Sequence, residues 1–171
     1  LKLKNIDRVK LGLQVSRFLK SRKISEQNEL RKNLLPQFFT WDKFSTTPMM
    51  NISEVKECAG VHELGAHSFD HASMEYEDEE YLQNDLLRCK DYFSEVIGIP
   101  ALIYVFPNGS CREEQIHRPL GLGYEHVLLV SNSFSRVGNK IHDRFGFHAS
   151  SKKEVFFRAV GGLSKIKCYT D

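Results

Sequence analysis

The sequence lacks the features that would place it in several specialised classes of protein. It has no run near the roughly 18 apolar residues that a helix needs to cross a bilayer. Its four cysteines, Cys58, Cys89, Cys111 and Cys168, show no Cys-x-x-Cys spacing, which argues against a zinc ribbon or a disulfide framework. A net charge of +2 requires no polyanionic partner. What remains is one domain's length, 171 residues, with an ordinary globular composition of 41% hydrophobic and 27% charged residues.

Acidic residues are scarce at the start of the chain. Residues 1–23 contain eight Lys or Arg and a single acidic residue, Asp7. Such a stretch could contact nucleic acid or another phosphate-rich surface. The alternative is a solvated helix face, because apolar residues recur there at near-helical spacing: Ile6, Val9, Leu13 and Phe18. No aromatic RNA-binding signature accompanies the basic residues, so we favour the helix face and expect no nucleic-acid partner.

Helices are predicted in two stretches before residue 60, residues 5–35 and residues 52–59. Residues 5–35 have helical spacing in two pieces, and Pro36 is expected to end the second piece. A short helix is predicted over residues 52–59, with Asn51 or Ser53 as its N-cap.

The clearest helix is predicted over residues 78–97. Asp78 is a suitable N-cap, and acidic residues in the first turn suit the positive end of the helix dipole. Gly98 suits the left-handed position just past the end, and Pro100 prevents continuation. The apolar stripe expected to pack against a sheet consists of Leu82, Leu86, Cys89, Phe93 and Val96.

Apolar runs after this helix predict the strands of a parallel sheet. Residues 101–106 and 126–130 are continuous apolar segments, as expected for strands buried on both faces. A short helix between them is predicted, with Ser110 as its cap. The alternation predicts a single α/β domain, with residues 1–50 as a helical and loop lead-in and residues 51–171 as β/α units.

Two histidines four residues apart form the most informative segment, Gly65-Ala66-His67-Ser68-Phe69-Asp70-His71. Side chains at this spacing lie on one face of a helical turn, and neutral imidazole is a common zinc ligand. Residues 61–64, just before it, mix apolar and polar side chains as a strand that runs toward a site does. On spacing alone, His67 and His71 either share a metal ion or are unrelated neighbours on a polar loop.

The segment resembles the second motif of the polysaccharide deacetylases, carbohydrate esterase family four, which reads His-Ser/Thr-x-x-x-His or His-Ser/Thr-x-x-His; the second form is the one that stands here. Residues 103–110, Ile-Tyr-Val-Phe-Pro-Asn-Gly-Ser, resemble the family's aromatic-Pro turn at the end of the next strand. Residues 144–147 and 156–162 are similar to the closing strand and helix of one branch. The resemblance covers residues 50–162 and implies a distorted (β/α)7 barrel, present here in part with its first strands missing.

The resemblance also implies a cofactor and two catalytic parts. Zn²⁺ or another divalent ion would be held by His67 and His71 and would polarise a water and the acetyl carbonyl of an N-acetylated glycan. The backbone N–H of Asn108 would donate to the oxyanion. Ser68 would support its loop by hydrogen bonding.

Further roles implied by the resemblance fall on the turn and on the end of the chain. Phe106, Pro107 and Asn108 would contact the sugar. His142 is the candidate for the family's late general acid, although its surroundings differ from the family pattern. Asp143 is either a substitute metal ligand or a loop residue paired with its neighbour Arg144.

One family feature is absent from the sequence. The family opens with Thr/Ser-Phe-Asp-Asp, which supplies the base and a third metal ligand, whereas no Asp-Asp pair occurs here. Because the chain starts with Leu1 and not Met, we expect it to be part of a longer protein, and an upstream Asp-Asp motif would settle this. No secretory signal is visible, and the cysteine usage fits the cytoplasm, but the compartment stays open.

Three functions follow from these patterns. The first is a metal-dependent hydrolase that removes N-acetyl groups from a sugar or polysaccharide, with this chain alone expected to be inactive. The second is an inactive deacetylase-like fragment that binds sugar or protein. The third is an unrelated α/β binding protein with a chance histidine pair. Missing strands would expose apolar surface, so we expect self-association or dependence on an absent N-terminal segment.

Overall fold

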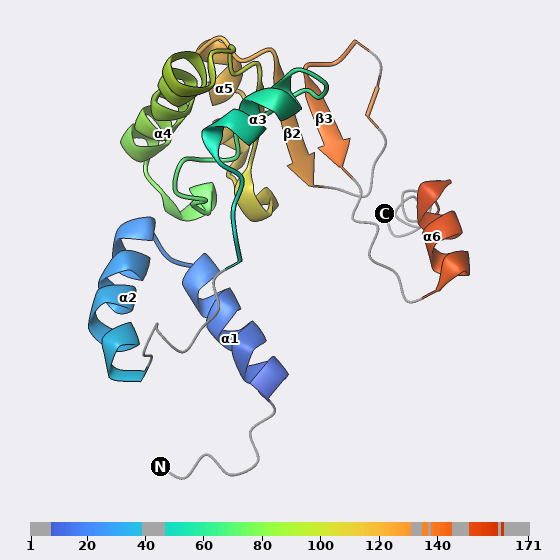
Figure 1. The fold of residues 1–171 in the computed structure, drawn as a ribbon. Helices are drawn as coiled ribbons and strands as arrows, with labels where there is room; N and C mark the ends of the chain where they lie inside the picture. The colour runs from blue at the N-terminus through green and yellow to red at the C-terminus, as the bar shows by residue number, and fades with distance from the viewer. Residues whose placement is uncertain are drawn as a thin grey trace.

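The computed structural model describes residues 8–38, 47–130, 135–136, 138–144, 151–160 and 162 (Figure 1). Its α-helices are α1 (Arg8–Lys20), α2 (Ile24–Phe38), α3 (Ile52–Ala59), α4 (Glu79–Tyr92), α5 (Arg118–Gly121) and α6 (Lys152–Ala159). Its strands are β1 (Ile103–Val105), β2 (His126–Val130) and β3 (Ile141–Arg144). Short 3-10 or π turns occupy Met74–Tyr76, Phe93–Ile97, Pro107–Gly109 and Glu113–Gln115. The fold is therefore mixed α/β.

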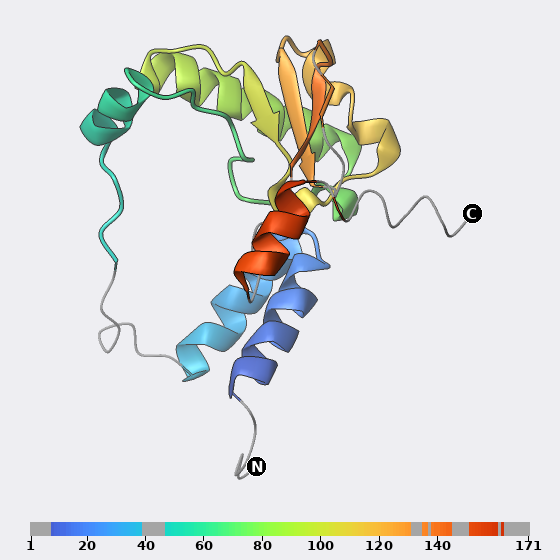
Figure 2. The same ribbon diagram turned by 90° about the vertical axis from the view of Figure 1, so that its right-hand side faces the viewer.

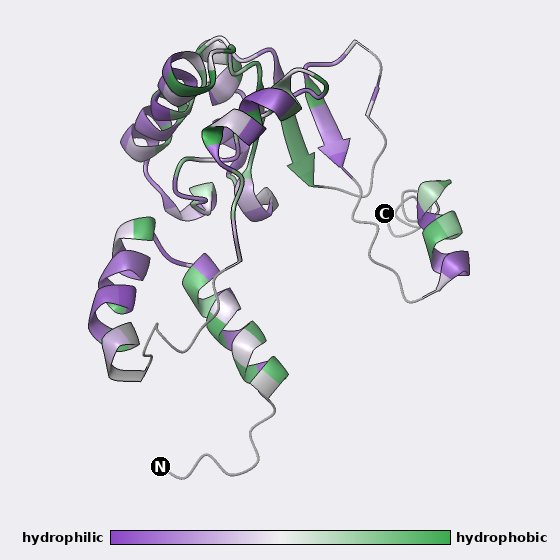
Figure 3. Cartoon of the chain, viewed as in Figure 1, coloured by the Kyte–Doolittle hydropathy of each residue, from purple (hydrophilic) through white to green (hydrophobic). Residues whose placement is uncertain are grey.

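The strands form one parallel sheet in the order β1-β2-β3. This confirms the predicted α/β class with parallel strands, while a seven-stranded barrel stays a prediction. Figure 3 shows β2 as apolar along its length and β3 as hydrophilic, which suits the central position of β2. The prediction of a strand over residues 61–64 is wrong. Only Ala66 joins the sheet there, through a single parallel bridge to Tyr104.

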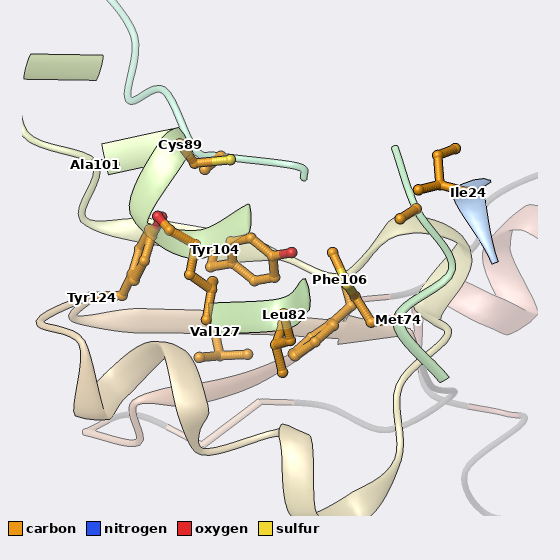
Figure 4. Packing of buried hydrophobic residues seen from close by; sticks show 12 residues of the cluster. Ile24, Met74, Leu82, Cys89, Ala101, Tyr104, Phe106, Tyr124 and Val127 are labelled. Carbon is orange, nitrogen blue, oxygen red and sulfur yellow. The ribbon is translucent and has the colours of Figure 1, made fainter. Parts of the chain in front are cut away.

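Helix α4 packs on the sheet as its sequence predicts. The Asp78 side chain accepts from the Tyr81 N–H at its start, and Gly98 adopts φ 88° past its end. The apolar face of α4 covers Tyr104, whose ring lies 5.1 Å from Phe106 and 5.6 Å from Tyr124 between centroids (Figure 4). The last turn differs from an α-helix, because residues 93–97 form a π turn.

Helices α1 and α2 form a hairpin beneath the sheet, and both views place them side by side (Figures 1 and 2). The hairpin turn is fixed to the body, since Glu77 accepts from the Ile24 N–H at 2.6 Å and Lys23 pairs with Asp78 at 2.8 Å. Pro36 was expected to end the second helix but lies inside the last turns of α2. Pro36 has no N–H to bond the carbonyl four residues earlier and its ring crowds that carbonyl, which fits the end of α2 only two residues later, at Phe38.

Two other local predictions have different outcomes. Asn51 caps α3 through a reciprocal capping box with Glu54, as predicted. Ser110, by contrast, does not cap a helix: its hydroxyl bonds to Glu75, and the next helical turn begins at Glu113. The polar contact across the loop replaces the local cap.

Three of the cysteines, Cys58, Cys89 and Cys111, are free thiols, while Cys168 lies outside the described residues. Within the described ranges, no helix is long and apolar enough to span a bilayer.

Candidate functional site

The two histidines of the sequence motif lie on a tight turn just beyond the bridge at Ala66. Ser68 and His71 both have positive φ, 60° and 55°, which non-glycine residues adopt only when other contacts support the turn. Here the Ser68 hydroxyl supplies such contacts: it accepts from the Ala72 N–H at 3.1 Å and donates to Asp85 at 2.9 Å. The turn is therefore held from within and from α4.

Asp85 is the buried anchor of this turn. Its side chain is 1% exposed and one oxygen accepts from both the Ser68 hydroxyl and the Phe69 N–H, at 2.9 and 2.8 Å. The other oxygen accepts from the Tyr104 hydroxyl at 3.2 Å. Desolvation raises the pKa of Asp85, and these three hydrogen bonds oppose the rise. The carboxylate thus joins the histidine turn to the core of the sheet.

The rings of His67 and His71 are in edge-to-face contact, with centroids 5.0 Å apart and an interplanar angle of 79°. The Nδ1–H of His67 donates to the Val105 carbonyl at 2.8 Å, which leaves Nε2 with its lone pair available. Metal-binding histidines are commonly oriented by such a bond from the second nitrogen. Desolvation lowers the pKa of His67, and His71 and Arg144 lower it further against the opposing Val105 bond, so the ring is neutral at neutral pH.

The Pro107–Gly109 turn follows β1 and presents Asn108 in a left-handed conformation, with φ 57°. The amides of Gly109 and Ser110 bond to the carbonyls of Phe106 and Pro107. No acceptor in the described part of the chain bonds to the Asn108 N–H. This amide is therefore available as a hydrogen-bond donor to a ligand.

His71 and Asn108 line a common pocket of about 350 Å³. Ser73 and Asp70 complete this side of the pocket, and the Asn108 amide group donates to the Ser73 hydroxyl at 3.3 Å. The opposite side is formed by α1 and α2. The histidine motif and the Pro107–Gly109 turn thus meet at one hollow, near the carboxyl end of β1.

Two residues predicted to contact sugar point elsewhere. The Phe106 side chain has no exposed surface, and the Pro107 ring is also fully buried. Both belong to the packing beneath the turn, because residues at the end of a buried strand continue its core face. Of the predicted trio, only Asn108 lines the pocket.

His142, the candidate general acid, lies in β3. No described hydrogen bond or ring contact joins it to His67 or His71. Its Nε2 is 3.0 Å from Nδ1 of His126 on the neighbouring strand. Asp143 exchanges backbone hydrogen bonds with the Ser135 hydroxyl, and no described ion pair joins it to Arg144. Arg144 ends β3, whereas residues 145–147, which were compared with the closing strand of the family, lie outside the described residues.

The donors present fit a divalent metal in part. Two imidazoles, one of them with an oriented nitrogen, are suitable for zinc, which takes neutral imidazole nitrogens at about 2.1 Å. Across the residues that the structure describes, no group of three His, Cys, Asp or Glu side chains is placed to hold an ion. A complete site therefore needs a further ligand from beyond the described residues or from solvent.

Asp85 is the functional residue that sequence reasoning missed. Its signal was a carboxylate inside the apolar stripe of α4, next to Leu86 and one turn from Leu82. A charged residue at a core position is costly unless hydrogen-bonded, so it indicates a buried partner. The partner, Ser68, could not be identified without the fold.

Comparisons with solved structures agree with the fold. By fold the chain is similar to a de-N-acetylase from Aggregatibacter actinomycetemcomitans, at 14% identity and a TM-score of 0.55, over 81% of this chain and 61% of that one. It is also similar to a polysaccharide deacetylase from Bacillus cereus, at 16% identity and a TM-score of 0.54, over 79% of this chain and 47% of that one. The chain thus spans less than two thirds of either structure.

The comparison with family models matches a shorter part of the chain than the fold comparison does, but it identifies one family. No curated protein matches the chain. The family model described as polysaccharide deacetylase matches residues 18–127, a range that contains both motif histidines and Asn108, and the chain therefore belongs to the polysaccharide deacetylase family.

Proposed function

We propose that this chain carries part of the active site of a metal-dependent hydrolase that removes N-acetyl groups from a sugar or polysaccharide. The observation that carries the proposal is the pairing of His67 and His71 with 5.0 Å between ring centroids, on a turn anchored to α4. Family membership supplies the reaction class. The chain's share of the known structures, 61% and 47%, fits an incomplete domain.

In this proposal each residue has a defined task. His67 and His71 would hold a divalent ion, which when bound supplies Lewis-acid activation of a water and of the acyl carbonyl. The free N–H of Asn108 would donate to the oxygen of the acyl group as negative charge develops there. Ser68 and Asp85 would keep the imidazoles in place, since a ligand-bearing turn with positive φ values needs such support.

Zinc titration by calorimetry tests the metal assignment. The chain should bind Zn²⁺ weakly, and His67→Ala or His71→Ala should each weaken binding at least about tenfold, because each removes one of two nitrogens. His62→Ala is the matched control, since this exposed histidine lies in the same segment and lines a different pocket. Equal zinc affinity in all three variants would remove the metal assignment.

A second candidate function is an inactive relative that binds sugar or protein. The observation in its favour is that, over the described ranges, no carboxylate joins His67 and His71 to complete a metal site. Acetate release by the complete natural protein separates the two. Release that depends on His67 supports the hydrolase, whereas sugar binding without release supports the inactive module.

A further inference from the structure

The wall of the pocket opposite His71 is formed by the α1–α2 hairpin and carries two cations. Lys20, at the end of α1, and Arg31, in the middle of α2, both line the pocket that His71 and Asn108 border. The two cations therefore share one hollow with two of the candidate functional residues, His71 and Asn108.

Neither cation has a carboxylate partner in the described part of the chain. The Arg31 guanidinium donates to two neutral amide oxygens, those of Asn28 and Gln27, both at 3.3 Å. No described Asp or Glu lies within ion-pair distance of Lys20 or Arg31. Two nearby cations differ in this respect, because Arg22 pairs with Glu26 and Lys23 pairs with Asp78.

The acidic side chain that lines the pocket does not compensate these charges. Asp70 binds Arg88 through one oxygen at 3.1 Å, and the same oxygen accepts from the Tyr81 hydroxyl at 3.1 Å. Its charge is thus matched by Arg88, which does not line the pocket. The pocket keeps an excess of positive charge beside the histidine turn.

The hairpin that carries the cations is fixed relative to the site. Ile24, in its turn, is 7% exposed and its N–H bonds to the buried carboxylate of Glu77. Gln27 is also 7% exposed, donates to the Arg22 carbonyl and accepts from Arg31. Arg31 is therefore held at the pocket by a buried neighbour.

We infer that the pocket takes an N-acylated sugar that also bears a negatively charged group, such as a phosphate ester. This inference rests on the proposed function and names its substrate class. The acyl group faces His71 and the Asn108 N–H, and the anionic group lies against Lys20 and Arg31. Charge-assisted hydrogen bonds from both cations bind the phosphate and orient the sugar.

Calorimetric titrations of the full chain with three probes test this inference: N-acetylglucosamine 1-phosphate, N-acetylglucosamine and inorganic phosphate. The sugar phosphate should bind at least about tenfold more tightly than either other probe. It alone can contact both the side of the pocket with His71 and the side with Lys20 and Arg31. Lys20→Met and Arg31→Met should each remove most of that preference. Arg17→Met is the matched control, since Arg17 is a cation of α1 that does not line the pocket.

The outcomes separate the two proposals. If the neutral sugar binds as tightly as the sugar phosphate, the anionic substrate class is overturned while the proposed function stands. If inorganic phosphate binds as tightly as the sugar phosphate, the pocket is a general anion site and the inference is also overturned. If neither sugar binds, or if His71→Ala changes neither affinity, the proposed function fails with it.

Discussion

Ser68 and Asp85 are 17 residues apart in sequence, and the Ser68 hydroxyl donates a 2.9 Å hydrogen bond to the Asp85 carboxylate. Through this bond the buried face of α4 holds the turn between His67 and His71. The same carboxylate also accepts from the Phe69 N–H and the Tyr104 hydroxyl. Asp85 therefore contributes both to the packing of α4 and to the placement of the two imidazoles.

Replacement of Asp85 should destabilise the fold and loosen the histidine turn. Asp85→Ala leaves the half-buried Ser68 hydroxyl, the Phe69 amide and the buried Tyr104 phenol without their acceptor, and we expect a loss on the order of 3 kcal/mol in the unfolding free energy. Asp85→Asn should cost less, because its amide oxygen can still accept from Ser68 and Phe69. Urea denaturation measures both changes. An Asp85→Ala protein as stable as Asp85→Asn would show that the three donors find other acceptors.

The zinc affinity of these variants tests the link from packing to the site. Asp85→Asn should retain most of the zinc affinity, since its turn keeps the bonds to residues 68 and 69. Asp85→Ala should lose zinc affinity by about tenfold or more under conditions where it is still folded, as losses of supporting contacts around metal ligands do. Unchanged affinity in folded Asp85→Ala would mean that the turn holds its shape unaided.

Elements with strong local signals could be predicted from the sequence. Helix α4 has a cap at Asp78 and a left-handed glycine at Gly98, and both lie where the pattern indicates. Strand β2 has the predicted bounds, since a continuous apolar run suits a central parallel strand. The segment before the histidines failed because Val61 is 76% exposed, and a strand there would need a partner that the described chain does not supply.

The candidate site was predictable in its motifs and not in its surroundings. His67, His71 and Asn108 follow from short patterns with a known spacing. The hairpin wall with Lys20 and Arg31 does not, because its position depends on the buried contact between Ile24 and Glu77 across 53 residues. No local pattern specifies such a contact, and for the basic start of the chain a solvated helix face was therefore favoured over a phosphate-binding surface.

Gly109 should be the more sensitive of two left-handed glycines. It has φ 67°, and an added Cβ would lie 2.8 Å from the Val130 Cβ, so Gly109→Ala combines backbone strain with a steric clash. We expect a loss of about 2–3 kcal/mol in the unfolding free energy. Gly98→Ala is the control, with φ 88° and nothing within 4 Å of the added Cβ, and it should cost about 1 kcal/mol. Thermal or urea unfolding of both variants measures the difference. Equal losses would mean that Val130 moves aside without cost.

Glu77 should make stability depend on pH. Desolvation raises the pKa of Glu77 above its ordinary value of 4.5, and Asp78 and Glu26 raise it further, against the lowering effects of the Ile24 N–H and Lys23. The folded state then binds the proton more tightly than the unfolded chain. The contribution of Glu77 to stability is fully present below pH 4.5 and is lost as pH rises through its folded pKa.

Glu77→Gln removes this titration and keeps an acceptor for the Ile24 N–H. The unfolding free energy of the variant relative to the natural protein should therefore increase between pH 4 and pH 7, as measured by urea denaturation at each pH. Glu57→Gln is a suitable control, because Glu57 is exposed and is not among the groups that shift the pKa of Glu77. A relative stability that falls over this range would show that attraction to Lys23 exceeds the cost of burial.

The purified chain 1–171 should release little or no acetate from N-acetylglucosamine oligomers, even with added Zn²⁺. A deacetylase needs a base to take the proton of the attacking water, and such a base is worth about 10²–10⁴-fold in rate. The sequence has no Asp-Asp pair, and in the described residues no carboxylate completes a metal site with His67 and His71. Acetate release that His67→Ala abolishes would contradict this expectation. Another carboxylate would then supply the missing function, and Asp143 would be the first to replace, because it lies in β3 beside Arg144, which lowers the pKa of His67.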